Sequence, residues 1–143
     1  MELSSPAFHL NGRIPKKYTC DGENVSPPLL IDSMPAGTES LVLIVDDPDA
    51  PNGLWVHWVV WNISPQERIE EGHIPGTQGL NDFGKYDYGG PCPPSGTHRY
   101  FFKLYAVDSR IDIDHNSTKE DIEKAIEGHV LAKAELVGLY SRE

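Results

Sequence analysis

The sequence predicts a mainly β protein, an antiparallel β-sandwich that forms one domain over residues 1–143. Short runs of β-branched and aromatic residues recur along the chain, and turn signals rich in glycine and proline separate them. The chain has 13 glycines and 12 prolines, which is above average for a globular protein but below the range typical of disorder. A length of 143 residues is close to the most common size of a single domain.

Four strands are expected, at residues 41–45, 56–62, 100–107 and 134–140. The turn signals between them lie at residues 48–53, 64–65, 72–79 and 89–96. Three tryptophans, at positions 55, 58 and 61, have the three-residue spacing of a helix, which is a competing interpretation of the second strand. Their neighbours are mostly valine, whose branched side chains favour a strand, so we reject the helix.

One short helix is expected near residue 120. The run Ser117-Thr-Lys-Glu120 has the pattern of a capping box, in which two side chains bond the free N–H groups at the start of a helix. Ile122 and Ile126 give the helix one apolar edge, and Gly128 is suited to its end.

The charge of the chain argues against two classes of partner. A formal net charge of −10 repels nucleic acids and anionic lipid surfaces, so we expect neither nucleic-acid binding nor binding to a membrane surface.

The longest aliphatic run, Leu41 to Val45, is far shorter than the ~20 residues of a membrane helix, so no membrane insertion is expected. The N-terminus has no pattern of a signal peptide, and a cytoplasmic protein is expected.

Two cysteines, Cys20 and Cys92, are too few for a disulfide framework. The simplest interpretation is two reduced thiols in a cytosolic protein. They would pair if the fold brought them together and the host were a hyperthermophile.

The stretch from Tyr88 to Tyr100 is the most informative part of the chain. Its prolines fix the backbone and its glycines permit unusual turns, which together indicate a rigid loop. The loop leads into a strand on which His98 and Tyr100 share a face. Two interpretations remain open at this point, namely a small anion pocket and a proline-rich turn with a capping histidine.

The period of two along the strands places polar groups at the ends of apolar rows. Asp47 continues the row of Leu41, Leu43 and Val45; His57 shares a face with Trp55, Val59 and Trp61; His98 and Tyr100 share a face with Phe102, Leu104 and Ala106. Such rows can form a polar floor at the edge of a hydrophobic core. Taken singly, Asp47 could instead cap its turn, and His57 could be a core histidine.

Three motifs occur together in the middle of the chain: Asp47-Pro-Asp-Ala-Pro51, His57-Trp-Val-Val-Trp-Asn62 and Gly90-Pro-Cys-Pro-Pro-Ser-Gly-Thr-His-Arg-Tyr100. With them, the sequence resembles the phosphatidylethanolamine-binding protein family, in particular its bacterial and archaeal Raf-kinase-inhibitor-like branch. The segments Tyr18–Pro27 and Ala134–Arg142 are also similar to that branch, so the resemblance covers nearly the whole chain.

The resemblance implies a Greek-key sandwich of two antiparallel sheets with one or two short helices and an anion pocket at one edge. It implies a homodimer, with no cofactor and no metal. The sequence ends at Glu143, where eukaryotic members continue into a helix that covers the pocket, so we do not carry over their lipid binding and kinase inhibition. The ligand-binding residues that the resemblance implies are Asp47, Pro51 (often after a cis bond in the family), His57, Cys92, Pro93, Pro94, His98 and Tyr100.

A carboxylate repels a bound anion, so Asp47 must have another role in such a pocket. We expect it to accept an N–H from a histidine and to favour the protonated form of that histidine. We expect a protonated His98 or His57 and the hydroxyl of Tyr100 to donate to the anion. Backbone amides near Cys92 and Ser95 would complete the site, and the neighbouring aromatic rows would form an apolar rim. Anion affinity should then weaken as the pH rises through the histidine range, nominally ~6.5.

The function expected is a non-catalytic module that binds a small anion, such as phosphate or a phosphorylated headgroup or peptide. It would regulate a partner protein, as a kinase or protease inhibitor does. The alternative is a hydrolase, with or without a metal, that uses Asp47, His57 and His98. The sequence contains no His-Glu-x-x-His helix and no Gly-x-Ser-x-Gly motif to support that alternative.

Overall fold

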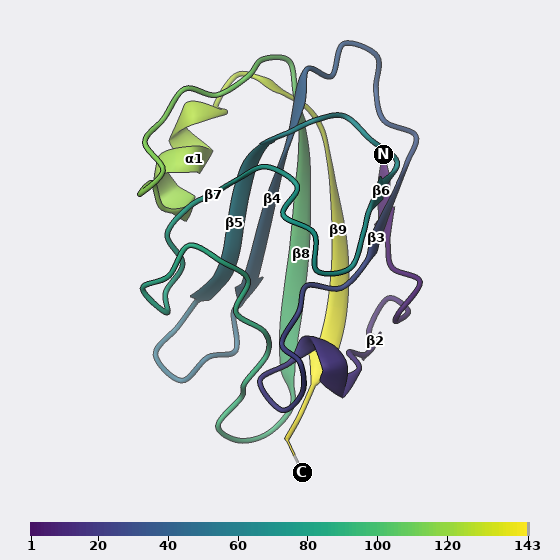
Figure 1. Ribbon diagram of the computed structural model, residues 1–143, viewed down its shortest axis with the longest axis vertical. Helices are drawn as coiled ribbons and strands as arrows, with labels where there is room; N and C mark the ends of the chain where they lie inside the picture. The colour runs from purple at the N-terminus through teal and green to yellow at the C-terminus, as the bar shows by residue number, and fades with distance from the viewer. Residues whose placement is uncertain (143) are drawn as a thin grey trace.

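Four long strands form the main sheet, and their order in space differs from their order in the chain. The computed structural model describes residues 1–142. The long strands are β4 (Ser40–Asp47), β5 (Trp55–Ile63), β8 (His98–Val107) and β9 (Val130–Tyr140), which confirms all four predicted strands. They lie in the order β9-β8-β4-β5, because a long connection over residues 64–97 carries the chain from β5 past β4 to β8 (Figure 1).

Five short strands complete two sheets and confirm the mainly β sandwich. The edges of the main sheet are β2 (Gly12–Arg13) and β7 (Thr77–Gln78), and the second sheet contains β1 (Glu2–Ser4), β3 (Leu29–Asp32) and β6 (Arg68–Ile69). The expectation of purely antiparallel sheets needs one correction, because β2 pairs with β9 in parallel. This pair begins where the N–H of Asn11 bonds the carbonyl of Val137, at 2.7 Å.

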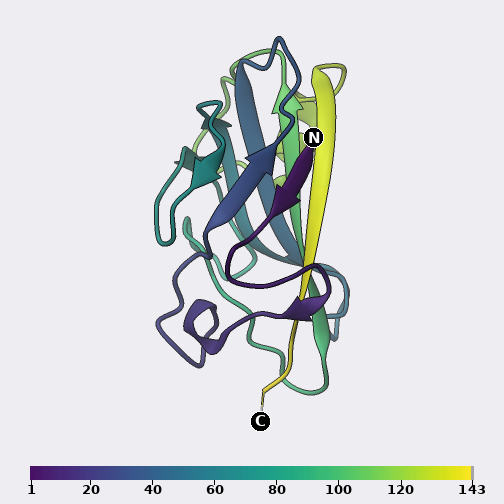
Figure 2. The same ribbon diagram turned by 90° about the vertical axis from the view of Figure 1, so that its right-hand side faces the viewer.

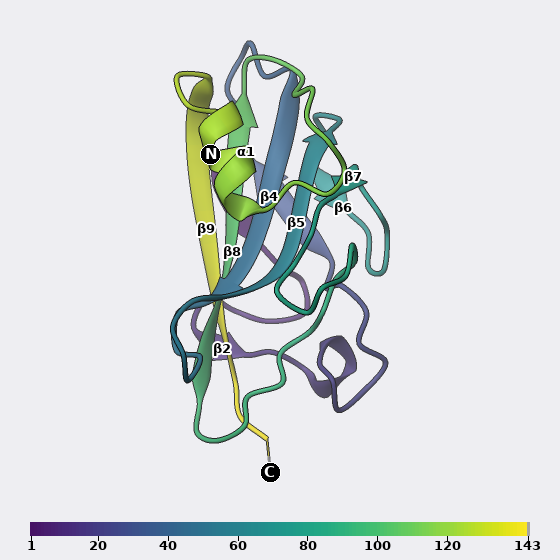
Figure 3. The ribbon, with the colours of Figure 1, turned by 90° about the vertical axis from the view of Figure 1, so that its left-hand side faces the viewer.

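The main sheet has a different cover on each face. On one face, large side chains of β4 and β8 such as Leu43 and Phe102 form the core with Leu29 and Ile31 of the second sheet, which crosses in front of the main sheet in Figure 2. On the opposite face, α1 (Lys119–Ala125) lies across the strands (Figure 3). The site described below lies at the end of the sheet remote from α1.

The capping box of α1 begins one residue later than predicted. Thr118 is the N-cap, and the carboxylate of Asp121 accepts its backbone N–H at 3.0 Å. Ser117 is buried, and its backbone bonds the neighbouring loops through Asp114 and Leu80, so it cannot serve as the cap. In the described part of the chain, the other helical element is a 3-10 turn, η1 (Lys16–Tyr18). Within residues 1–142, no helix is both long and apolar enough to span a bilayer.

A disulfide joins Cys20 to Cys92, so the interpretation as two reduced thiols is wrong. The fold brings the two Cα atoms to 5.4 Å, because the loop that leads to β8 runs along the segment after η1. Two hydrogen bonds hold this loop in place: the N–H of Cys20 donates to Pro91 at 3.1 Å, and the hydroxyl of Tyr88 donates to the carbonyl of Tyr18 at 2.8 Å. The cross-link therefore fixes a loop whose next residues line the site.

Candidate ligand-binding site

A β-bulge in β5 directs His57 into the site. Val45 pairs with Trp58, but the next residue, Asp46, pairs with Val56, so His57 is an extra residue without a partner on β4. An extra residue breaks the alternation of faces and re-aims the side chain. The expectation that His57 shares a face with Val59 and Trp61 is therefore wrong. Those two residues pack in the cluster on the helix side, whereas His57 lies in a cavity with Asp47 and Tyr100.

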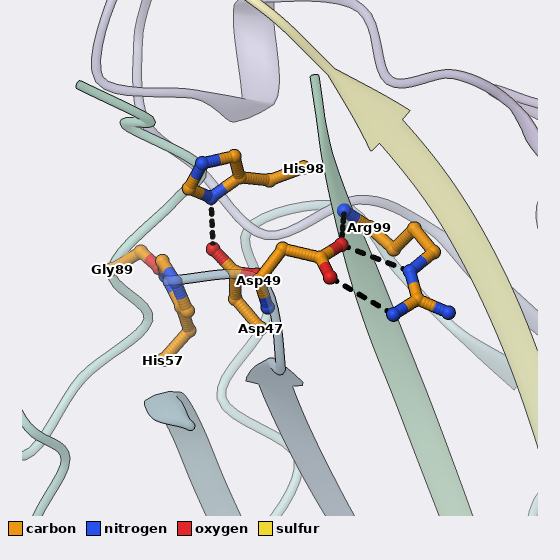
Figure 4. A network of polar contacts seen from close by, with 6 residues as sticks. All are labelled: Asp47, Asp49, His57, Gly89, His98 and Arg99. Atoms are coloured by element: carbon orange, nitrogen blue, oxygen red, sulfur yellow. Dashed lines mark hydrogen bonds and ion pairs between the residues drawn. The ribbon is translucent and has the colours of Figure 1, made fainter. Parts of the chain in front are cut away.

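Asp47 and His98 form a buried pair in the wall of this cavity. The Nδ1 atom of His98 lies 2.6 Å from Oδ2 of Asp47, and both side chains are almost fully buried (Figure 4). The other carboxylate oxygen of Asp47 accepts the N–H of Asp49 at 2.7 Å, which starts the turn after β4. The carboxylate therefore both caps a turn and orients an imidazole, so the two interpretations of Asp47 are compatible.

Arg99 lies next to the pair, but its charge is already compensated. Its guanidinium donates two hydrogen bonds to the carboxylate of Asp49, each at 2.9 Å (Figure 4). These bonds lower the pKa of Asp49 to about 2. No lysine or arginine is among the residues that line the cavity, whereas two carboxylates, those of Asp47 and Asp82, are. The cavity therefore has no fixed cation to attract a strongly charged anion.

His57 is held as a neutral imidazole. Its Nδ1 atom lies 2.7 Å from the carbonyl oxygen of Gly89, and because a carbonyl only accepts, Nδ1 carries the proton. The rings of Phe83 and Tyr100 meet it edge to face, at 5.2 and 5.3 Å between centroids. Burial lowers the pKa of His57, and the bond to Gly89 only partly opposes this effect. The sequence led us to expect a protonated His98 or His57 as a donor to the anion. Because its pKa is lowered, His57 is not a cation at neutral pH in the free protein.

This lowered pKa predicts how stability depends on pH. In the unfolded chain a histidine titrates near ~6.5, so below that pH the unfolded state binds a proton that folded His57 resists. We expect His57 to make the protein less stable as the pH falls from ~6.5 towards its folded-state pKa, with no further loss below. Thermal unfolding between pH 8 and 5 should therefore show a steeper loss for the native chain than for His57→Gln. Parallel curves for the two proteins would contradict the shift.

Tyr100 contributes a buried hydroxyl without a partner. Its side chain is 1% exposed, and the hydroxyl makes no hydrogen bond of standard geometry within residues 1–142, although the carboxylate of Asp47 lies close enough to act on it. Burial, and then the charge of Asp47, raise the pKa of Tyr100, so the group remains a neutral donor. A buried hydroxyl normally has a partner, and one without any in a cavity wall is suited to donate to a ligand.

The structure brings together all eight residues proposed from the sequence. They line one cavity of about 440 Å³, and they are Asp47, Pro51, His57, Cys92, Pro93, Pro94, His98 and Tyr100. Two details differ from expectation. Ser95 is exposed and is not among the lining residues. There is no cis peptide bond in residues 1–142, so Pro51 follows a trans bond.

One side of the cavity was not anticipated from the sequence. Phe83 and Asp82 come from the loop after β7, and Leu54 and Asn52 come from the turn between β4 and β5. The loop is shaped by Asn81, which is buried and accepts the N–H groups of Phe83 and Lys85, both at 3.0 Å. A buried asparagine at the centre of a turn has no clear signal in a single sequence.

The lining residues differ from those of hydrolases that use a side-chain nucleophile or a metal cluster. Cys92 is in a disulfide, so its sulfur is not a nucleophile, and the lining residues include no serine or threonine. Among residues 1–142, no group of three histidine, cysteine or acidic side chains is arranged to hold a metal ion. The arrangement instead provides hydrogen-bond donors in an apolar enclosure, which is the composition of a ligand-binding site.

The fold is a β-sandwich of two sheets with a cavity at one end of the main sheet. The chain belongs to the phosphatidylethanolamine-binding protein family, whose pattern it matches over residues 4–141. It is 52% identical to a UPF0098 protein of Methanothermobacter thermautotrophicus over 99% of both chains. A crystal structure of the family homologue CT736 from Chlamydia trachomatis is similar, with a TM-score of 0.96 and 45% identity over 99% of this chain and 97% of that one. E. coli YBCL, another family member, has a TM-score of 0.90 and 31% identity over 99% of this chain and 98% of that one.

Proposed function

We propose that this protein binds a singly charged oxyanion or phosphoryl group in the cavity without transforming it, and that it regulates a partner protein through this binding. The observation that carries the proposal is the meeting of the Asp47–His98 pair with the unpartnered hydroxyl of Tyr100 in one cavity. Within residues 1–142, the pair uses only Nδ1 of His98, and the buried hydroxyl of Tyr100 has no hydrogen-bond partner of standard geometry.

The pair supplies a directed donor. Because Asp47 accepts at Nδ1, the ring of His98 is fixed, and its Nε2 atom is directed away from Asp47 (Figure 4). When the ring is protonated, Nε2 donates to an anion while the carboxylate balances the charge of the imidazolium. Tyr100 adds a second donor, and neutral His57 can accept a hydrogen bond at Nε2 from an ammonium or hydroxyl group of the ligand.

The charges of the lining favour a monoanion. A doubly charged phosphate would meet two carboxylates and no fixed cation, whereas a phosphodiester or a carboxylate carries only one charge. The exposed rings of Trp55 and Phe83, in edge contact at 5.5 Å, lie at the mouth near Asp82. Aromatic faces beside a carboxylate suit an ammonium group. A headgroup with one phosphodiester and one ammonium, as in the name of the family, therefore fits this composition.

The test is calorimetric titration at pH 5.5 and 8 with acetate and with glycerophosphoethanolamine, which has one phosphodiester and one ammonium group. Acetate keeps one negative charge over this range, so a pH effect on its affinity comes from the protein. We expect weaker binding at pH 8, because a neutral imidazole contributes no charge to the site. Tyr100→Phe should weaken binding roughly 10- to 100-fold without loss of stability, because a hydrogen bond to a charged group contributes ~1.5–3 kcal/mol.

Tyr105→Phe is the matched control, since Tyr105 lies on the same strand but is not among the lining residues. Equal acetate affinity at both pH values would refute the role of His98 as a charged donor. Unchanged binding by Tyr100→Phe would refute the role of the hydroxyl. Regulation of a partner is tested separately, by recovering proteins that bind this chain from host lysate with and without saturating acetate. The absence of any partner whose recovery depends on acetate would contradict it.

A further inference from the structure

The turn between β4 and β5 contains an asparagine followed by a glycine at the mouth of the cavity. Asn52 lines the cavity, and it is exposed together with the residues on either side of it. Figure 1 shows this turn projecting from the lower end of the main sheet. An asparagine loses its side-chain amide most readily before glycine, which has no Cβ to keep its nitrogen away from the side-chain carbonyl. The sequence has one other pair of this kind, Asn11-Gly12, which serves as an internal comparison.

The reaction at Asn52 needs no partner other than water. The backbone nitrogen of Gly53 attacks Cγ of Asn52 and loses its proton, so that a five-membered succinimide ring closes and the side-chain nitrogen leaves as ammonia. Water then opens the ring at either carbonyl. Opening at Cγ gives aspartate, and opening at the main-chain carbonyl gives isoaspartate, in which the chain continues through Cγ. Overall, one water is consumed, one ammonia is released, and a carboxylate replaces a neutral amide.

Few contacts hold Asn52 and Gly53 in place. The N–H of Gly53 makes one hydrogen bond, to the carbonyl of Ala50 at 3.1 Å, within the turn itself. Asn52 makes no hydrogen bond of its own within residues 1–142. A Cβ placed on Gly53 would meet no atom within 4 Å, so the surroundings of its nitrogen are open. An exposed turn with so few bonds opens at a small cost in free energy, which allows the nitrogen to reach the side chain.

The pair Asn11-Gly12 is held on both sides. The N–H of Asn11 donates to the carbonyl of Val137 on β9, and the N–H of Gly12 donates to the carbonyl of His9, both at 2.7 Å. Gly12 also belongs to β2 and pairs with Gly138 of β9. Attack by the nitrogen of Gly12 would break these contacts. The fold therefore distinguishes two pairs that are identical in sequence.

Conversion of Asn52 would change the charge at the mouth of the cavity. Asp47 and Asp82 already line the cavity, and no lysine or arginine does. A further carboxylate at the mouth repels a bound anion, although water weakens the effect of an exposed charge. Isoaspartate would also lengthen the main chain by one carbon just before Leu54, which lines the same mouth.

We propose that Asn52-Gly53 is a site of spontaneous deamidation, and that its conversion to aspartate or isoaspartate weakens anion binding in the cavity as the protein ages. The effect on affinity rests on the proposed function, whereas the reaction itself does not. The two parts are therefore tested by separate measurements.

The reaction is tested by incubating the native chain at mildly alkaline pH and following the masses of its proteolytic peptides. The peptide with Asn52 should gain the mass difference between an amide and an acid, and it should become a substrate for a protein isoaspartyl methyltransferase. The peptide with Asn11 should remain unchanged. In urea, where the fold is lost, both peptides should convert at similar rates. An Asn52 that persists in the folded chain but converts in urea, or equal conversion of the two sites in the folded chain, would overturn the proposal.

Acetate titrations of fresh and converted protein measure the effect on binding. Converted protein and Asn52→Asp should bind acetate roughly two- to fivefold more weakly than the fresh native chain, and inert salt should reduce the difference. Asn52→Gln is the matched control, since its longer side chain closes a ring far more slowly and its affinity should not change during the same incubation. Equal affinity of fresh and fully converted protein would overturn the effect on binding. If the fresh protein does not bind acetate, the proposed function fails and the effect on affinity fails with it, while the peptide masses still decide the reaction.

Discussion

Replacing Cys20 and Cys92 together with alanine should lower the free energy of unfolding by about 4 kcal/mol. The disulfide closes a loop with a sequence separation of 72 residues. In the chain-entropy model, a cross-link over such a distance removes much of the freedom of the unfolded chain, and the stabilisation grows with the logarithm of loop length. Urea unfolding of the oxidised native chain and of the double variant measures the difference.

The native chain under strong reductant should unfold like the double variant, which separates the effect of the cross-link from that of the substitutions. A difference below about 1 kcal/mol would contradict the prediction. Anion affinity should fall only a few-fold, because the loop keeps other attachments to the segment after η1. The N–H of Gly90 donates to the side chain of Asn24 at 2.9 Å, and Cys20 still bonds Pro91 through its backbone.

Trp58→Ala should lower the free energy of unfolding by roughly 3–5 kcal/mol, the range for removing a large buried aromatic side chain. Trp58 is 1% exposed, its ring meets Tyr88 edge to face at 5.4 Å, and its Nε1 donates to Gln78 at 2.7 Å. The substitution would leave a large cavity and an unpartnered amide oxygen. Chemical denaturation measures the loss.

Trp55→Ala is the matched control, because Trp55 lies on the same strand and is 38% exposed at the mouth of the cavity. It should cost less than about 1 kcal/mol, since it leaves no enclosed void. Its effect should instead be on the affinity for ligands with an ammonium or apolar group. Equal losses of stability in the two variants would show that burial does not distinguish them.

The sequence was sufficient for the long strands but not for the short ones. The runs that became β4 and β8 are long and rich in β-branched or aromatic residues, so local preference and burial agree. By contrast, β2, β6 and β7 have two residues each, and they exist only because a longer strand lies beside them. Pairing that depends on tertiary structure leaves no period in the sequence from which it could be predicted.

The candidate site was predictable as a set of residues but not as a geometry. The motifs named the residues around Asp47, His57 and His98, and the cavity contains all of them. The period of two gave the wrong face for His57, since one unpaired residue reverses the alternation. The neutral state of His57 could not be predicted from the sequence either. It depends on burial and on the carbonyl of Gly89, which is distant in the chain.

The bulge at His57 also has an evolutionary consequence. Loss of that single codon would remove the register shift between Val45 and Asp46 and one imidazole from the cavity, while the hydrophobic layers on both sides of the sheet kept their register. Gain of one codon does the reverse. A sandwich of this kind can therefore acquire or lose a histidine in the cavity wall in one step, without a change in its architecture.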